Sequence, residues 1–210
     1  MDKYYKITEQ YLKVLSSAKD ERMMHSFLKS RPYLIRNAFN PLAWNHISII
    51  PEFQLVNKYR VDFVILSADS GQWFATFIEL KSHRTRPFTK EGIYSRALNQ
   101  GIQQLQNRMK WIRQNDIDFR QLLSDYFREK KVPSQCSRVD IHSHAFTEIM
   151  DRRTCISFQY YLVIGRRNMI NSDLQFNRHL FAHDKIEIVT YDRLFDVAVK
   201  LDNPNINKNV

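Results

Sequence analysis

Residues 59–82 read YRVDFVILSADSGQWFATFIELKS, and this stretch decides the fold. Two apolar runs flank the turn signal DSG, a pattern that predicts a β-hairpin. If Ser70–Gly71 form the loop, Asp62 lies directly opposite Glu79, because partners in a hairpin are equidistant from the turn. Lys81 lies on the same face, since side chains alternate along a strand. The register therefore predicts three charged side chains close together on one face of the hairpin.

The two carboxylates of this cluster favour a divalent cation. Asp62 and Glu79 stand inside the apolar segments VDFVIL and TFIEL, where burial of an unpaired carboxylate is costly. Opposed carboxylates repel each other, and Mg²⁺ or Mn²⁺ between them would remove that repulsion while keeping waters for a substrate. Lys81 could then position the attacking water or stabilise charge on a phosphate. The grouping suits cleavage of phosphodiester bonds; the ordinary alternative is a salt bridge of Lys81 at the sheet surface.

Basic side chains follow the cluster directly. The loop after Lys81 reads SHRTRPFTK and brings His83, Arg84, Arg86 and Lys90 to the exit of the same strand. Such a loop could hold the phosphate backbone of a nucleic acid, and its ordinary alternative is a solvated surface turn.

Two expected helices add candidate residues. Glu21 shares a helix face with Met24 and Leu28, so its carboxylate points toward the apolar side, although it could merely favour the helix dipole. Gln100 and Gln104 lie four residues apart beside an apolar stripe, where they could orient a water or a phosphate. Glutamines on a helix surface without a function are the commoner case.

Hydrophobic periodicity predicts one domain in which helices and strands alternate at both ends of the chain. This pattern indicates an α/β or α+β fold with a mixed β-sheet flanked by helices. The expected helices cover residues 4–18, 21–30, 98–112, 119–129, 171–183 and 192–201, and the expected strands cover 47–56, 59–66, 72–82, 158–165 and 185–191. Residues 130–151 are polar and without a period, which predicts a long loop or an insertion.

Composition limits the class of protein. The 210 residues carry 32 Lys and Arg against 22 Asp and Glu, a formal charge of +10 that favours a polyanionic partner. With Gly 4 and Pro 6 the chain is neither collagen-like nor disordered, and no apolar run approaches the ~18 residues that span a membrane. The charged first residues are no signal peptide and Cys 2 gives no disulfide framework, so we expect a cytoplasmic protein.

The ordered set of segments resembles the PD-(D/E)XK nuclease superfamily and, more narrowly, the nuclease domain of Shedu antiphage-defence proteins. The resemblance extends over about residues 20–200 and is carried by ERMMHSFLKSRPYLI, YRVDFVIL, FIELKS, LNQGIQQL, YYLVIGRR and IEIVTYDRLFD. It implies a restriction-endonuclease-like core and a metal-dependent DNA endonuclease or nickase in bacterial immunity. A catalytically silent module that binds nucleic acid or protein on the same fold is the alternative.

The resemblance also implies roles for individual residues. Asp62 and Glu79 would be ligands of Mg²⁺ or Mn²⁺, Lys81 the catalytic lysine, Glu21 an accessory acid and Gln104 the helix glutamine. Two positions depart from the superfamily pattern. Arg108 stands where an aromatic residue is often found four residues after the glutamine, and Val61 stands where proline often precedes the catalytic aspartate. Gln100 and Gln103 are the alternatives to Gln104.

The short N-terminal part is a further departure. Shedu proteins commonly place a variable sensing region before the nuclease, yet about twenty residues precede Glu21 here. We therefore expect an N-terminal helical extension at 1–19, a nuclease domain at 20–202 and a flexible tail at 203–210. Control is expected from assembly into a homo-oligomer, from a regulatory partner chain or from the loop at 130–155.

Overall fold

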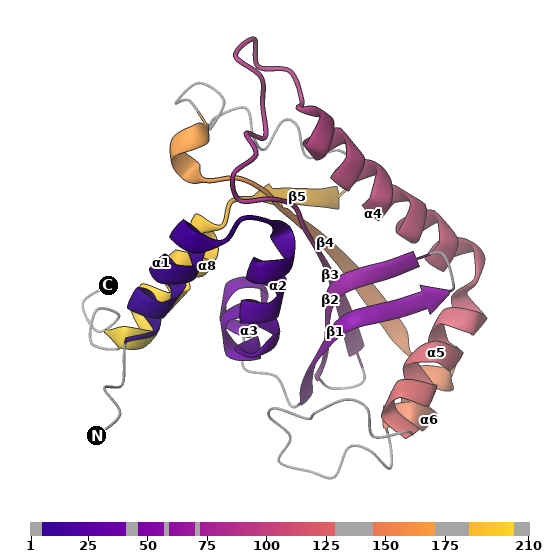
Figure 1. The fold of residues 1–210 in the computed structure, drawn as a ribbon. Helices are drawn as coiled ribbons and strands as arrows, with labels where there is room; N and C mark the ends of the chain where they lie inside the picture. The colour runs from indigo at the N-terminus through magenta and orange to yellow at the C-terminus, as the bar shows by residue number, and fades with distance from the viewer. Residues whose placement is uncertain are drawn as a thin grey trace.

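The structure is a computed structural model that describes residues 6–40, 46–56, 59–69, 72–128, 145–170 and 185–203. A mixed β-sheet lies at its centre with helices on both faces, which confirms the predicted fold class (Figure 1). In chain order the elements are α1 (Ile7–Ser17), α2 (Glu21–Lys29), α3 (Pro32–Phe39), β1 (His46–Val56), β2 (Tyr59–Asp69), β3 (Gln72–Leu80), α4 (Arg96–Gln114), α5 (Asp116–Arg128), α6 (Ala145–Met150), β4 (Cys155–Val163), η2 (Arg167–Met169), β5 (Ile186–Val189) and α8 (Asp192–Asp202).

The sheet has the strand order β1-β2-β3-β4-β5. The first three strands pair antiparallel, whereas β4 pairs with β3, and β5 with β4, in parallel. A parallel step needs a crossover connection, and α4, α5 and α6 lie within the one from β3 to β4. The C-terminal ends of β3, β4 and β5 therefore meet at one edge of the sheet.

The predicted hairpin register is confirmed along the pairing of β2 with β3. Asp69 pairs with Gln72 next to the loop, and Phe63 pairs with Ile78 at the far end of the ladder. The loop residues themselves, 70–71, lie outside the described residues. The pair expected next, Asp62 with Glu79, falls just beyond the last ladder pair.

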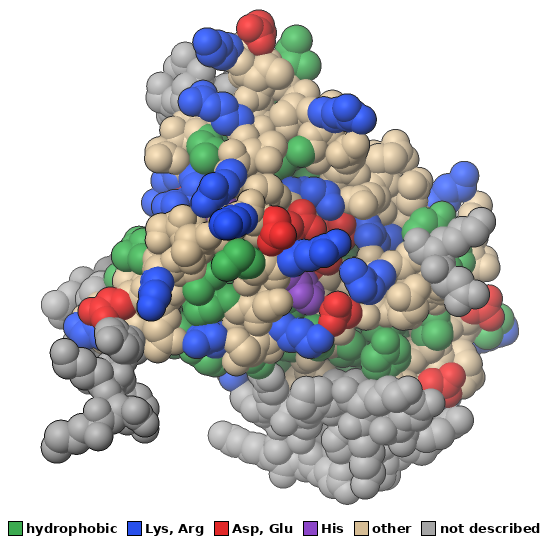
Figure 2. Space-filling view, in the orientation of Figure 1, with side chains coloured by type: hydrophobic (Ala, Val, Ile, Leu, Met, Phe, Trp, Pro, Cys, Tyr) green, Lys and Arg blue, Asp and Glu red, His purple; other side chains and the backbone are tan. Residues whose placement is uncertain are grey.

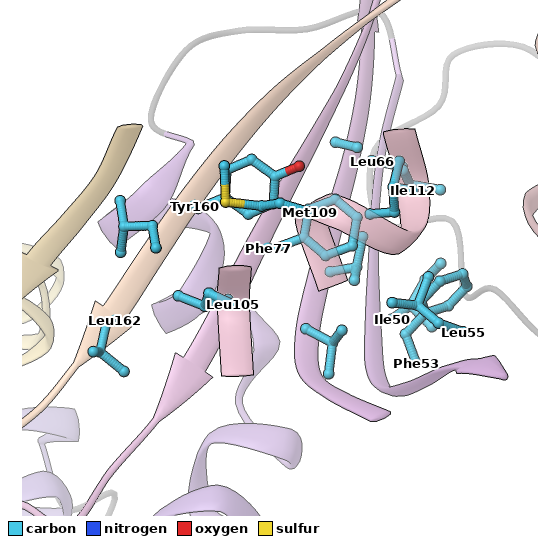
Figure 3. Close-up of a cluster of buried hydrophobic side chains, with 14 of the residues drawn as sticks. Ile50, Phe53, Leu55, Leu66, Phe77, Leu105, Met109, Ile112, Tyr160 and Leu162 are labelled. Carbon is cyan, nitrogen blue, oxygen red and sulfur yellow. The ribbon is translucent and has the colours of Figure 1, made fainter. Parts of the chain in front are cut away.

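Each face of the sheet has its own hydrophobic core. On one face α4 and α5 cover a cluster that includes Phe77, Leu105 and Met109, of which Figure 3 shows a part. On the other face α1, α2, α3 and α8 bury Tyr11, Leu28 and other apolar side chains against the same strands (Figure 1). The α4-side core and the α2-side core thus fix the sheet from both sides.

Helix α1 is tied to the end of the chain as well as to the α2-side core. The Tyr11 hydroxyl donates to the Tyr191 carbonyl at 2.8 Å, and the backbone N–H groups of Ile7 and Thr8 donate to the Asp202 carboxylate at 3.0 and 2.8 Å. The expected N-terminal extension at 1–19 therefore packs against α8 over its described part.

Several elements differ from their predicted form. Helix α3 is additional, and Pro32 occupies its first turn, where the N–H that proline lacks has no partner within the helix. The helix expected at 21–30 does end before Pro32, as α2. Helix α6 lies within the stretch 130–151 that was predicted as a loop or an insertion, α5 begins at Asp116, and β4 begins at Cys155. The helix expected at 171–183 and most of the loop at 130–155 lie outside the described residues.

Among the described residues, no helix combines the length and the apolar character needed to cross a membrane.

Candidate active site

Strands β1 and β2 are distorted at the same level. Glu52 on β1 has φ 54, in the left-handed region that residues other than glycine rarely adopt. The ladder between the strands pairs the residues on either side but skips Glu52 and Asp62. On β2, Val61 belongs to the α4-side core and Phe63 to the α2-side core, although regular alternation would place both on one face. The strand therefore rotates at Asp62.

Asp62 also lies where β2 separates from β3. The ladder ends at the pair Phe63–Ile78, and the backbone N–H of Leu80 donates instead to Oδ2 of Asp62 at 2.7 Å. The side chain of Asp62 thus bonds an N–H group that the ladder leaves unpaired. This contact fixes the Asp62 carboxylate beside the segment that carries Glu79 and Lys81.

Glu79 is buried, with 3% of its surface exposed, and two cations face its carboxylate. Nζ of Lys81 donates to Oε1 at 3.0 Å. Nη2 of Arg108 lies 3.1 Å from Oε2, in an ion pair without the geometry of a hydrogen bond. The negative charge of Glu79 is therefore compensated by Lys81 at one carboxylate oxygen and by Arg108 at the other.

The electrostatics show that the carboxylates act on one another. Burial and, after it, the negative charge of Asp62 together raise the pKa of Glu79 to about 7, against the opposing charges of Arg108 and Lys81. Burial also raises the pKa of Glu21, where Lys81 opposes the shift and Asp62 adds to it. The four predicted residues Glu21, Asp62, Glu79 and Lys81 thus lie within electrostatic reach of one another.

Helix α2 brings Glu21 to this cluster. The carboxylate of Asp20 accepts the backbone N–H of Met23 at 3.2 Å and caps the helix, so that Glu21 stands in its first turn. One turn later, Nε2 of His25 lies 3.4 Å from the Asp62 carbonyl oxygen, and the His25 ring lies against Phe63 with centroids 4.9 Å apart. Sequence reasoning missed His25, although its spacing of four residues from Glu21 on one helix face was a usable signal.

The residues present fit a hard divalent cation. Asp62 and Glu79 supply carboxylate oxygens, and Mg²⁺ is commonly held by one or two carboxylates with water completing its coordination. Burial and the charge of Asp62 both raise the pKa of Glu79, and a cation between the two carboxylates would relieve their repulsion. Within the described ranges, no three His, Cys, Asp or Glu side chains form a group suited to a metal ion.

The basic loop after β3 matches its predicted position only in part. Arg84, Arg86 and Lys90 are exposed, but His83 is buried with 3% of its surface exposed. The His83 ring packs edge-on against Tyr191. Burial lowers the pKa of His83, and the nearby positive charge of Arg84 acts in the same direction. His83 therefore lies inside the fold, and the expectation that it contacts a nucleic acid is corrected.

The surface around the cluster is strongly charged. Figure 2 shows acidic side chains gathered in the middle of one face, between α2 and α4, with Lys and Arg side chains around them. Two further arginines that follow β4 are already paired: Arg166 binds Asp192 with 2.9 Å between Nη2 and Oδ1, and Arg167 binds Asp196 at 2.5 Å. Those two arginines are engaged in holding the start of α8.

The glutamines of α4 take part in none of the contacts described above. Gln100, Gln103 and Gln104 are all exposed, and Gln103 donates to Oδ1 of Asn107 at 3.1 Å. Gln104 stands one helical turn before Arg108, and it is Arg108 that reaches Glu79. The helix residue that touches the cluster is thus the one that departs from the superfamily pattern.

Comparison with known families gives a match. A family model described as Shedu protein SduA, C-terminal, matches residues 18–195, a range that contains every candidate residue named above. No curated protein matches the chain.

Proposed function

The chain belongs to the family described as Shedu protein SduA, C-terminal, and from that membership we propose that it is a metal-dependent DNA nuclease. The family suggests a role in antiphage defence. The observation that carries the nuclease proposal is the cluster at the separated ends of β2 and β3. There the Asp62 carboxylate is bound to the N–H of Leu80, and Lys81 contacts the buried Glu79.

Each residue of the cluster has a role in this proposal. Asp62 and Glu79 would hold Mg²⁺ or Mn²⁺, which would polarise the phosphate and lower the pKa of a bound water. The ammonium group of Lys81 would orient the attacking water and stabilise charge that develops on the phosphate. Glu21 would be an accessory acid, and Gln104 would orient a water or a phosphate from the exposed face of α4.

DNA would lie across the basic side chains beside the cluster. Arg84, Arg86 and Lys90 are exposed on the loop that leaves β3, immediately after Lys81. Contacts of this kind neutralise phosphates and position the strand but read little sequence. We therefore expect cleavage with weak sequence preference.

A plasmid assay tests the proposal. Supercoiled DNA is incubated with the protein and Mg²⁺ or Mn²⁺, with EDTA and with Lys81→Ala as negative controls. Lys200→Ala is the matched control, because Lys200 is exposed in the last turn of α8. We expect nicked or linear DNA only with the metal and only from the wild type and Lys200→Ala. A wild type without metal-dependent cleavage would overturn the proposal.

One observation favours a second candidate, a silent module that binds nucleic acid. Lys81 and Arg108 already compensate the charge of Glu79, so the cluster is stable as an ion-paired network. Metal-independent retardation of DNA in a gel, without nicking by the wild type, would identify the chain as such a module.

A further inference from the structure

Arg108 bridges the two strands that carry the candidate metal ligands. It comes from α4, and only 6% of its surface is exposed. Nε donates to the carbonyl oxygen of Arg60 on β2 at 3.1 Å, and Nη2 contacts the same oxygen. Nη2 also lies 3.1 Å from Oε2 of Glu79 on β3. One guanidinium group therefore spans the gap between β2 and β3.

The separation of the strands explains why a donor is needed there. The β2–β3 ladder ends at the pair Phe63–Ile78, so the Arg60 carbonyl lies beyond the last β3 partner. The contact at this carbonyl is partly buried, and the guanidinium of Arg108 supplies donors in place of a ladder partner. At the same separation of β2 from β3, the Asp62 carboxylate accepts the Leu80 N–H. The contacts made by the side chains of Arg108 and Asp62 thus take the place of backbone hydrogen bonds between the two strands.

Stability alone is a weak reason for this arginine. Burying an ion pair removes two charged groups from water, and a pair of apolar side chains of similar volume in place of both partners is often at least as stabilising. The neighbouring positions Leu105, Met109 and Ile112 on α4 are apolar and pack in the α4-side core. A charged residue among them, directed at Glu79, points to a role in the site.

We propose that Arg108 is a positioning residue of the metal site, which holds the Glu79 side chain in the orientation that receives the cation. The inference rests on the function proposed above. A carboxylate has about four lone-pair sites, so Glu79 can stay ion-paired with Arg108 and still bind a metal. Such partners of ligating side chains fix the geometry of a metal site before the ion arrives.

Direct measurement of metal affinity tests this role independently of cleavage. Mn²⁺ binding is measured by calorimetry on the metal-free wild type, Arg108→Met and Arg108→Lys. Arg113→Met is the matched control, because Arg113 is exposed on the same helix. We expect Arg108→Met to lose ~10-fold or more in affinity, which is the usual effect of removing such a partner. Arg113→Met should bind as the wild type does.

The lysine variant separates positioning from simple filling of space. Lysine keeps the positive charge beside Glu79 but lacks the planar fork that also reaches Arg60. We expect Arg108→Lys to recover most of the affinity lost in Arg108→Met. If Arg108→Met does not fold, Arg108→Gln replaces it, because its amide can still donate to the Arg60 carbonyl while the charge is removed.

The outcomes discriminate clearly. If Arg108→Met binds Mn²⁺ as tightly as the wild type or more tightly, the arginine competes with the cation and the inference is wrong. If Arg108→Lys binds no better than Arg108→Met, charge at this position does not support the site and the inference is also wrong. A wild type that binds no Mn²⁺ and nicks no plasmid would instead overturn the proposed function itself.

Discussion

The Asp62 carboxylate accepts the backbone N–H of Leu80 at 2.7 Å, immediately beyond the last pair of the β2–β3 ladder. This contact gives the side chain a structural task as well as its proposed role as a ligand. Only Oδ2 makes the contact, so the two tasks use different parts of one carboxylate. Substitutions at Asp62 can therefore separate them.

Replacing Asp62 by asparagine should abolish cleavage while preserving the fold. The asparagine carbonyl can still accept the Leu80 N–H, but a neutral amide is a poor ligand for a hard cation. We expect the nicking rate to fall by about 100-fold or more, since ligand loss removes the proposed metal chemistry. Rates with Mn²⁺ and thermal unfolding curves of the same preparations provide the measurement.

Asp62→Ala is the informative comparison for that variant. It removes the acceptor as well as the ligand and leaves the Leu80 N–H unpaired, which costs about 1–3 kcal/mol. We expect it to unfold at a lower temperature than Asp62→Asn, with both inactive. Equal stabilities for the two variants would show that the contact with Leu80 contributes nothing to folding.

The sequence predicts the hairpin register because a two-residue loop leaves little freedom in how the strands pair. The cluster of Asp62, Glu79 and Lys81 follows from that register and from alternation along the strands. The rotation of β2 at Asp62 does not follow, because it depends on the left-handed backbone of Glu52 on another strand. A glutamate at that position gives no signal of positive φ.

The contacts of Arg108 and His83 depend on tertiary packing, and for that reason they could not be predicted from the sequence. Arg108 reads as a departure from a family pattern, and only the crossing of α4 over the separated strands brings it to Glu79. His83 reads as part of a basic loop, yet the parallel strands bring the turn after β5 against it and bury the ring on Tyr191. Both outcomes depend on residues far apart in the chain.

The pairing of Asp192 with Arg166 should make stability depend on pH. Burial alone would raise the pKa of Asp192, but hydrogen bonds from Arg166 and from the Arg167 backbone hold it below its usual range. A lowered pKa stabilises the fold above the unfolded value of about 3.9, and this contribution is lost as pH falls through the folded value. Asp192→Asn should therefore cost about 2 kcal/mol at pH 7 and progressively less below about pH 4.

Denaturant unfolding of the wild type and Asp192→Asn at neutral and acidic pH measures this difference. Asp196→Asn is the matched control, because Asp196 pairs with Arg167 on an exposed part of the same helix. An exposed pair contributes at most about 1 kcal/mol. A cost for Asp192→Asn that stays constant at acidic pH would contradict the assigned ionisation.

Gly165 should tolerate no side chain. Its φ is +64, and a Cβ at this position would lie 2.6 Å from the Thr85 carbonyl oxygen. Gly165→Ala should therefore lower the unfolding temperature, with a cost above the ~1–2 kcal/mol of a left-handed alanine alone. Gly165→Asn should be no better, although asparagine accepts positive φ, because its Cβ meets the same oxygen. If Gly165→Asn were clearly more stable than Gly165→Ala, the cost would come from backbone strain at positive φ and not from the contact of Cβ with the Thr85 carbonyl oxygen.

The exposed basic side chains of the loop after β3 should contribute to DNA affinity through phosphates. Arg86→Gln combined with Lys90→Gln removes two of the cations expected to lie under the backbone, whereas His83, being buried, is left intact. Each neutralised phosphate contributes about 0.9 to the slope of log affinity against log salt for duplex DNA. We expect the double variant to bind more weakly and its slope to fall by about 1–2, measured by fluorescence anisotropy in EDTA.

A second double variant decides whether that loss is local. Lys13→Gln with Lys200→Gln removes the same charge from exposed positions on α1 and α8, outside the loop after β3. If DNA follows the loop after β3, this variant should keep most of the wild-type slope, because it changes only the overall charge. Equal losses in the two double variants would mean that the surplus of +10 acts as a diffuse field, without a defined path for the DNA beside Lys81.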